Sequence, residues 1–170
     1  MRIFGLAGWS GSGKTTLVTA LIPEFVARGL TVSTIKHAHH GFDIDQPGKD
    51  SWRHRQAGAS EVMVVSRRRW ALMRELRDEP EPGLGTLLPL ITPVDLLLIE
   101  GFKRHAHPKI EVYRPSLGKP PLYPDEPFVV AVASDQELSG LTLPQLPLGR
   151  PELIAEFILR YEDGGIPWRS

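Results

Sequence analysis

The sequence has 170 residues, of which 41% are hydrophobic, a length that suits one domain with a sizeable core. Its 20 Lys and Arg side chains balance 20 Asp and Glu, and this zero net charge argues against nucleic acid or an acidic membrane surface as a general partner. Cysteine is absent, which excludes disulfides and thiolate metal sites, and no segment resembles a signal peptide or a membrane span, so we expect a soluble cytoplasmic protein.

The first third of the chain alternates strand and helix signals. Residues 2–7 form a short apolar run typical of a buried strand, and residues 31–35 form a second one. Between them, residues 14–28 repeat apolar side chains with helical spacing, and Gly29 follows where a helix is expected to end. The expected buried face of this helix consists of Leu17, Leu21, Phe25 and Val26. Pro23 is expected to bend the helix, because its ring clashes with a preceding carbonyl.

The middle of the chain predicts further elements of both kinds. They are a helix near residues 49–57, strands at 61–65 and 69–73, a loop at 78–85 and a short helix near 86–91. A basic corner, Ser66, Arg67 and Arg68, separates the two strands, and we interpret it as a solvated turn. The aromatic and aliphatic residues of the strand at 69–73 suit either a core or a contact across a dimer.

The second half of the chain contains its most apolar segment. Residues 94–99 are almost continuously aliphatic, as in a central strand that is buried on both faces. Strands are also predicted at 109–113 and 128–133, and five prolines between 115 and 127 predict an irregular loop. Pro151 at a first helical turn marks the start of a closing helix. This order of elements predicts an α/β fold with a mostly parallel sheet.

A glycine-rich loop stands between the first strand and the first helix. Residues 8–15 fit the pattern G-x-x-x-x-G-K-[ST], in which backbone amides and a helix N-terminus hold phosphate. Lys14 is expected to reach the β- and γ-phosphates, and the Thr15 hydroxyl is expected to bind Mg²⁺. The loop residues expected at the nucleotide are Gly8, Ser10, Gly11, Ser12, Gly13, Lys14 and Thr15. The motif predicts a nucleoside triphosphate ligand and a single P-loop NTPase-type domain over residues 1–170, with three layers and helices on both faces of the sheet.

A carboxylate is needed to complete the magnesium site. Glu100 ends the aliphatic strand, at the carboxyl edge of the sheet where the P-loop is also expected. Asp95 begins the same strand and is expected at the opposite edge. Aspartate is the usual residue at the position of Glu100, so the longer side chain is expected to act on Mg²⁺ through water rather than directly. The alternative is a solvated acid at a strand end.

The segment from residue 36 to residue 60 concentrates histidines, acids and cations after the second strand. His37, His39 and His40 precede Asp43 and Asp45. Such a segment suits the positioning of water, the binding of a second metal, or the binding of an anionic substrate. Neighbouring histidines in a loop more often contact solvent, backbone or phosphate than a metal ion, so we favour those roles.

Several motifs occur together in a specific order. They are AGWSGSGKTTL, IKHAHHGFDIDQPGKDS, RQAGA, RWALM, LLLIEGFK, PKIEVYR and AVASD. In this order the chain resembles the MobB family, molybdopterin-guanine dinucleotide biosynthesis protein B, from about residue 4 to residue 135. The P-loop alone is shared by many proteins, but D-x-P-G-K-D-S after the histidines and I-E-G-F-K later are specific.

The resemblance implies a GTP-binding protein with weak GTPase activity that works as a homodimer. It implies an adapter role in molybdenum cofactor biosynthesis, assisting the formation or delivery of molybdopterin guanine dinucleotide. The implied partners are the MobA guanylyltransferase, which joins GMP to the molybdenum-bearing pterin, and other molybdenum cofactor proteins. Besides GTP and Mg²⁺, the implied ligand is molybdopterin or molybdopterin guanine dinucleotide.

The family pattern also implies roles for particular residues. Phosphate and metal binding would fall to Gly11, Ser12, Gly13, Lys14, Thr15 and Thr16. The facing surface would be lined by Asp45, Lys49, Asp50, Arg53 and Arg55, with Lys36, His37 and Lys103 adding positive charge towards a pterin phosphate. We hypothesise that Lys49, Arg53 and Arg55 hold the anionic cofactor; the alternative for all three is an ordinary exposed helix surface.

Base recognition and hydrolysis leave weaker signals. Asp135 follows the strand at 128–133, where a carboxylate could accept hydrogen bonds from guanine, although the string N-K-x-D is absent and a cap or turn explains this acid equally well. We expect a modest preference for GTP over ATP. Asp43 or Asp45 is expected to orient water, with Lys14 and Glu100 completing the catalytic group, and turnover is expected to be slow because no arginine finger is evident.

Two other classes of protein share part of this pattern. A metallochaperone-type GTPase would have the P-loop and the histidines, but such proteins usually add cysteine ligands, and this chain has none. A small-molecule kinase would need an acceptor pocket and usually a lid that carries arginine, and the stretch from Arg114 to Pro127 offers few cations.

Overall fold

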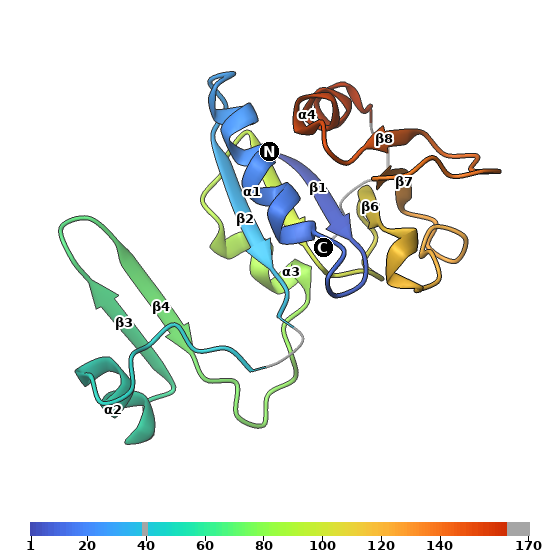
Figure 1. Ribbon diagram of the computed structural model, residues 1–170. Coiled ribbons are helices and arrows are strands. Elements are labelled where there is room, and N and C mark those ends of the chain that lie inside the picture. Colours follow the sequence, from blue (N-terminus) through green and yellow to red (C-terminus); the bar gives the residue numbers. More distant parts are fainter. Residues whose placement is uncertain (39–40, 163–170) are drawn as a thin grey trace. The chain divides into compact units, whose positions relative to one another are not determined.

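The computed structural model describes residues 1–38 and 41–162, and the chain divides into two compact units (Figure 1). Unit 1 comprises Met1–His37 and Pro89–Ser170, and unit 2 comprises Ala38–Leu88. In sequence, unit 2 is therefore an insertion between two parts of unit 1. The expectation of one nucleotide-binding domain over residues 1–170 stays a prediction.

Unit 1 is built on a six-stranded sheet in the order β2-β5-β1-β6-β7-β8. Its strands are β1 (Arg2–Ala7), β2 (Val32–Lys36), β5 (Leu96–Glu100), β6 (Lys109–Tyr113), β7 (Val129–Ser134) and β8 (Gln145–Pro147). All neighbouring strands in this sheet run parallel. The predicted α/β fold of P-loop NTPase type, with its mostly parallel sheet, is confirmed.

The aliphatic segment that ends at Glu100 lies inside the sheet, as predicted. β5 pairs with β2 on one side and with β1 on the other, and the side chains from Leu96 to Ile99 are buried. Parallel strands need both faces covered, which is why such strands read as continuous apolar runs. In contrast, β8 was not predicted, because it has only three residues, follows Pro144 and ends with Pro147. Proline is tolerated in this strand because β8 lies at the edge of the sheet, where a missing N–H breaks no hydrogen bond between strands.

The helices α1 (Lys14–Val26) and α4 (Pro151–Arg160) pack into one hydrophobic cluster with the sheet, and α1 is drawn along it in Figure 1. From α1 and α4 the cluster takes Leu17, Val18, Leu21, Phe25, Ile154, Ala155 and Ile158. Helical spacing explains most of this face, but the predicted burial of Val26 is wrong, since that side chain is 56% exposed. α1 continues through Pro23 and ends at Val26, before the predicted end of the helix.

The loop from Pro115 to Pro127 is irregular, as predicted, apart from the 3-10 turn η2 (Pro115–Leu117). A buried carboxylate holds it in place. Both oxygens of Glu111 on β6 accept hydrogen bonds from the backbone N–H groups of Leu122 and Tyr123, at 2.8 Å and 2.9 Å. Burial raises the pKa of Glu111, and the two N–H donors oppose that shift. A segment without regular structure is thus fixed to the sheet by one side chain.

Unit 2 contains two short helices and a hairpin. The elements are α2 (Asp50–Gln56), β3 (Glu61–Val65), β4 (Trp70–Arg74) and α3 (Leu84–Leu87), followed by the 3-10 turn η1 (Leu88–Leu90). β3 and β4 pair antiparallel, and the backbone N–H of Ser66 donates to the carbonyl of Arg69 at 2.9 Å. The basic corner is therefore a turn, as predicted. No helix in the described ranges is long and apolar enough to cross a bilayer.

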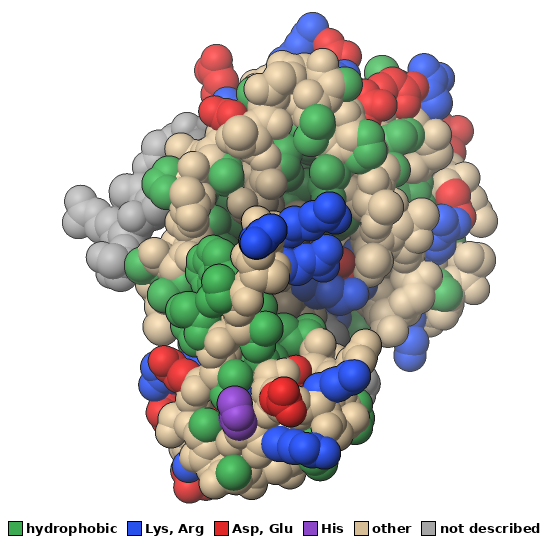
Figure 2. All heavy atoms as spheres, turned by 90° about the vertical axis from the view of Figure 1, so that its left-hand side faces the viewer, with side chains coloured by type: hydrophobic (Ala, Val, Ile, Leu, Met, Phe, Trp, Pro, Cys, Tyr) green, Lys and Arg blue, Asp and Glu red, His purple; other side chains and the backbone are tan. Residues whose placement is uncertain are grey.

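One face of the hairpin exposes large hydrophobic side chains. Met63 lies opposite Leu72, and Val65 lies opposite Trp70, so the four side chains share a face. Their exposed fractions are 59%, 44%, 68% and 65%. A core role for Trp70, Leu72 and Met73 is one of the two interpretations of this strand. It does not fit Trp70 and Leu72, which are exposed, whereas Met73 is half-buried. Other hydrophobic side chains also reach the surface on the face of the molecule drawn in Figure 2.

A buried histidine packs against the centre of β1. His107 is fully buried, and a Cβ atom on Gly5 would lie 2.4 Å from its Nε2 atom, so only glycine fits at that position of the strand. Burial lowers the pKa of His107 to about 3, and the nearby charges of Lys109 and His105 act in the same direction. Since a histidine in the unfolded chain titrates near 6.5, the unfolded state takes up a proton between these two pH values while the folded state does not. The free energy of unfolding therefore decreases as the pH falls from 6.5 towards 3, because protonation of His107 favours the unfolded state.

We therefore expect the free energy of unfolding to drop by about 2 kcal/mol between pH 7 and pH 5 through this one group. Urea unfolding at several pH values measures the slope. His107→Gln should flatten it, whereas His105→Gln, at an exposed neighbouring position, should leave it intact. An unchanged slope in His107→Gln would contradict the assignment.

Candidate functional site

The loop from residue 8 to residue 15 joins β1 to α1 with a backbone that glycine makes possible. Gly8, Gly11 and Gly13 have φ angles of 144°, 81° and 99°, in the region that side chains disfavour. At Gly8 a Cβ atom would also lie 2.5 Å from the carbonyl oxygen of Val112, so the loop approaches β6 too closely for any other residue. Gly13 is the N-cap of α1, so the positive N-terminal end of the helix dipole lies at the end of this loop.

Ser12 provides a test of whether this loop fits an anion. The residue is buried, and its Oγ atom has no hydrogen-bond partner among the described residues. A buried hydroxyl without a partner costs free energy, so such a group calls for explanation by a ligand. A phosphate oxygen in the loop would accept this hydrogen bond. The chemistry of the loop fits a nucleotide phosphate.

Lys14 is held inside the same loop. Its Nζ atom donates to the carbonyl oxygen of Trp9 at 2.8 Å. Burial lowers the pKa of Lys14, Glu100 opposes this shift, and Lys103 and Lys36 add to it. The ammonium group therefore lies among other charges, and exchange of a neutral carbonyl for phosphate would strengthen its hydrogen bonding.

Glu100 and Thr15 meet at the carboxyl edge of the sheet. The Thr15 hydroxyl donates to Oε1 of Glu100 at 2.6 Å, and Nζ of Lys36 lies 3.9 Å from the same oxygen. Asp95, at the other end of β5, accepts instead from the backbone N–H and the hydroxyl of Thr31. Both acids lie where the sequence predicted. Hydroxyl and carboxylate oxygens are ligands that Mg²⁺ prefers, and the role of this pair in metal binding stays a prediction.

The remaining predicted P-loop residues are exposed. Ser10 lies in the loop itself, and Thr16 lies in the first turn of α1. Asp135 follows β7 and forms an ion pair with Arg114, whose Nε atom donates to the carbonyl oxygen of Ser12 at 3.0 Å. Asp135 is thus linked to the P-loop through an arginine that sequence reasoning missed. Its predicted role in recognising guanine stays a prediction.

Trp9 was also missed, because it occupies a variable position of the motif. Its Nε1 atom donates to the carbonyl oxygen of Pro120 at 2.7 Å, which fixes the ring against the proline-rich loop. Nζ of Lys103 lies 4.4 Å from the centre of the Trp9 ring. Just after β2, the ring of His37 contacts the ring of Phe102 in a tilted arrangement, with 4.7 Å between ring centres. Lys36, His37 and Lys103 all belong to unit 1: Lys36 ends β2, His37 follows it, and Lys103 lies in the segment after β5.

Arg55 in unit 2 binds three carboxylates. Its guanidinium donates to Asp43 at 2.8 Å, to Asp45 at 3.0 Å and to Glu75 at 2.7 Å, and the side chain is only 12% exposed. These bonds raise the pKa of Arg55, and the same arginine lowers the pKa of Asp43. Asp45 also accepts from the Ser51 hydroxyl at 2.6 Å. Arg55 therefore ties the loop before α2 to α2 itself and to the end of the hairpin.

The three residues predicted to hold the anionic cofactor, Lys49, Arg53 and Arg55, differ in their contacts. The donors of Arg55 are already used by carboxylates, which gives this residue a structural role. Lys49, the N-cap of α2, and Arg53 are exposed, and neither forms an ion pair within the described parts of the chain. They are the better placed of the three for binding an anion. The predicted role of Asp45 in orienting water also stays a prediction, since its carboxylate is held by Ser51 and Arg55.

The histidine tract is described only in part. His39 and His40 lie outside the described residues. Within residues 1–38 and 41–162, no group of three or more histidine, aspartate or glutamate side chains is arranged to hold a metal ion.

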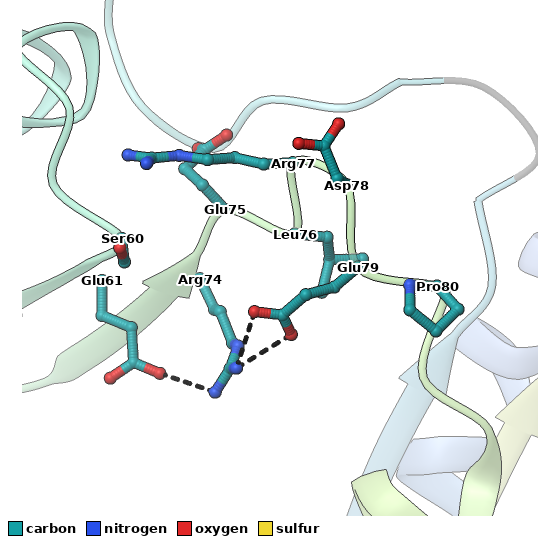
Figure 3. A pocket seen from close by; sticks show the side chains of 9 residues that line it. All are labelled: Ser60, Glu61, Arg74, Glu75, Leu76, Arg77, Asp78, Glu79 and Pro80. Atoms are coloured by element: carbon teal, nitrogen blue, oxygen red, sulfur yellow. Dashed lines mark hydrogen bonds and ion pairs between the residues drawn. The ribbon is translucent and has the colours of Figure 1, made fainter.

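Unit 2 also carries a surface depression of about 830 Å³ beside the end of β4 (Figure 3). Arg74 lies within it between Glu61 and Glu79, with contacts of 3.1 Å and 2.9 Å. Since Arg74 is already neutralised by these acids, it is a poor partner for an anion in the depression.

Comparison with known proteins shows the family to which this chain belongs. The model of the family described as molybdopterin guanine dinucleotide synthesis protein B matches residues 3–135. A molybdopterin-guanine dinucleotide biosynthesis adapter protein of Escherichia coli is 42% identical over 162 residues, which are 94% of this chain and 92% of that protein. The corresponding protein of Haemophilus influenzae is 44% identical over 159 residues, which are 92% of this chain and 86% of that protein.

Solved structures agree in fold. A crystal structure of molybdopterin-guanine biosynthesis protein B is 30% identical, with a TM-score of 0.72 over 92% of this chain and 96% of that chain. The structure of Bacillus subtilis MobB, at 24% identity, has a TM-score of 0.73 over 96% of this chain and 99% of that chain, and at this identity it supports the fold alone.

The division between Arg55 and its neighbour Arg53 can be tested directly. We expect Arg55→Leu to lower the thermal stability of the protein and to speed amide hydrogen exchange in unit 2, because three carboxylates would lose their common partner. The matched change Arg53→Leu, on the exposed side of the same helix, should leave both quantities close to those of the unaltered protein. Equal exchange rates in the two variants would contradict a structural role for Arg55.

Proposed function

The chain belongs to the molybdopterin guanine dinucleotide synthesis protein B family, and we propose that it serves this biosynthesis as an adapter protein that binds GTP with Mg²⁺ and hydrolyses it weakly. The observation that carries the nucleotide proposal is the P-loop itself. A buried Ser12 hydroxyl without a partner lies in a glycine-lined loop, and the next turn places Thr15 against Glu100 at 2.6 Å. These groups are complementary to phosphate and to a divalent cation.

Each group has a proposed part in holding the nucleotide. The loop amides, Ser12 and Lys14 would bind the β- and γ-phosphates. Thr15 and Glu100 would hold Mg²⁺, which neutralises phosphate charge when bound. Asp135 would accept hydrogen bonds from the guanine base, which requires exchange with its present partner Arg114.

The proposal of weak hydrolysis rests on which groups are available for the chemical step. Fast GTP hydrolysis needs an acid or amide that orients water and a cation that opposes the developing charge. Asp43 or Asp45 is predicted to orient water, but Asp43 is paired with Arg55, and both oxygens of Asp45 are engaged by Ser51 and Arg55. Slow turnover suits an adapter, for which binding and release matter more than the rate of the chemical step.

A second ligand is proposed for unit 2. Lys49 and Arg53 are exposed cations on adjoining turns of one helix end, without carboxylate partners in the described structure. We propose that they bind the phosphate of molybdopterin or of molybdopterin guanine dinucleotide. As an adapter, the protein would bring this ligand to the MobA guanylyltransferase and to other molybdenum cofactor proteins in the cytoplasm.

The exposed hairpin face is proposed to contact a second copy of the chain. Met63, Val65, Trp70 and Leu72 form an exposed apolar face, and the ion pair of Glu61 with Arg74 stands at one end of it. A two-stranded hairpin is marginally stable by itself, and within the described residues no third strand pairs with β3 or β4. Association of two such faces would bury these side chains around a two-fold axis.

Replacement of Lys14 tests nucleotide binding. Lys14→Ala is expected to abolish GTP binding in isothermal titration calorimetry with Mg²⁺, because the loop loses its only lysine. Lys119→Ala, an exposed lysine in the proline-rich loop, serves as the matched control and should bind normally. ATP should compete less well than GTP. If the unaltered protein ignored both nucleotides, the proposed function would be wrong.

A single charge tests the homodimer. Leu72→Glu is expected to convert dimers to monomers in sedimentation velocity, because a carboxylate would have to be buried in the apolar contact. Leu90→Glu makes the same change at an exposed leucine outside the hairpin and should leave the dimer intact. A monomeric unaltered protein, or a dimer that tolerates Leu72→Glu, would contradict the proposed contact.

A further inference from the structure

A buried lysine on β6 has no part in the function described so far. Lys109 is fully buried, and its Nζ atom donates to the carbonyl oxygens of Lys103 at 2.9 Å and of His105 at 2.6 Å. Glu126 lies 3.7 Å from the same atom, and the ring of Phe128 lies 5.4 Å from it. Burial of an ammonium group is costly, so these four partners indicate a specific task for it.

The task concerns the segment that follows β5. Residues 101–108 connect Glu100, at the end of β5, to β6. Two backbone carbonyls of this segment point at the Lys109 ammonium group, and these two bonds hold the segment against the sheet. Because one of the carbonyls belongs to Lys103, Lys109 determines where the Lys103 side chain begins.

The Lys103 side chain reaches the P-loop. Its Nζ atom lies 4.4 Å from the centre of the Trp9 ring, and the carbonyl oxygen of Trp9 accepts the hydrogen bond of Lys14. Two ammonium groups therefore contact one residue of the loop. No carboxylate forms an ion pair with Lys103 within the described residues. Burial lowers the pKa of Lys103, and the charge of Glu111 opposes this shift.

Trp9 provides a fixed platform for this second cation. The ring is held by its own hydrogen bond to Pro120 at 2.7 Å. A cation over an aromatic ring gains only about 0.5–1 kcal/mol at an exposed site. A phosphate oxygen is a much stronger partner for an ammonium group, so Lys103 can exchange the ring for an anion in the loop.

We propose that Lys103 contacts the terminal phosphate of a bound nucleoside triphosphate, and that Lys109 is a positioning residue that holds Lys103 at the P-loop. This proposal rests on the proposed nucleotide binding and deepens it. The loop amides and Lys14 also bind the β-phosphate, which a diphosphate and a triphosphate share, whereas the second cation beside Lys14 gains a partner only when the third phosphate is present. Lys103 therefore makes the site selective for the triphosphate state.

The ratio of GTP affinity to GDP affinity, measured by calorimetry with Mg²⁺, tests this role. Lys103→Met should weaken GTP binding about tenfold or more, the value of one charge-assisted hydrogen bond, while GDP binding stays within about twofold. Lys103→Arg should restore most of the preference for GTP, because it restores the charge. Arg104→Met, at the exposed neighbouring position, is the matched control and should keep the ratio of the unaltered protein.

Lys109→Met tests the positioning role and should lower the same ratio while the Lys103 side chain is still present. Circular dichroism shows whether Lys109→Met folds. If this variant does not fold, the affinity ratio of Lys103→Met by itself decides the proposal. Equal losses for GTP and GDP in Lys103→Met, or no loss for either, would overturn the proposal while the proposed GTP binding stands. An unaltered protein that binds neither nucleotide would overturn both.

Discussion

Parallel pairing of β1 with β5 and β6 is the constraint on which the site depends. In a parallel sheet every strand ends at the same edge, so the segments that follow these strands are brought together there although they are distant in sequence. The P-loop follows β1 and Glu100 ends β5, and the Thr15–Glu100 hydrogen bond at 2.6 Å is a direct result of this pairing. Arg114 follows β6 and reaches the carbonyl of Ser12 from the other side. The buried sheet supplies the rigidity, and the strand ends supply the chemistry.

The charges at this edge are supported by charges beneath it. Lys109 and Glu111 stand two residues apart on β6, and both are fully buried. Each uses its charge to bind backbone groups of a neighbouring loop: Lys109 holds the segment with Lys103, and Glu111 holds the proline-rich loop on which Trp9 rests. Removal of either charge would free a loop that has no α-helix or strand to fix it. The polar layer inside an otherwise apolar sheet thus explains how irregular segments keep a defined position around the P-loop.

Unit 2 is held together by a different kind of interaction. Its hairpin exposes one apolar face, and the loop before α2 is tied to the hairpin by Arg55 and its three carboxylates. A small unit that leaves large hydrophobic side chains in water gains less from burial and depends more on such a network. The same exposed face is what an association surface requires. An adapter needs surfaces for partners, and the composition of unit 2 is consistent with that use.

Local patterns in the sequence determine most of the strands of this protein and part of its site. The spacing of hydrophobic residues and the positions of glycine and proline predict β1, β3 and β6 at their observed bounds. They predict the other strands, except β8, to within two residues. The phosphate-binding motif, together with the end of the aliphatic strand, predicts that Thr15 and Glu100 meet. These features follow from neighbours in the chain or from the general rule that parallel strands end at one edge. Tertiary structure alone decided the pairing of Arg114 with Asp135, the place of Lys103 over Trp9, the burial of Lys109 and the exposure of Trp70 and Leu72. Each of these depends on which distant segments pack together, and a charged or aromatic side chain carries no local signal of the partner that it will meet.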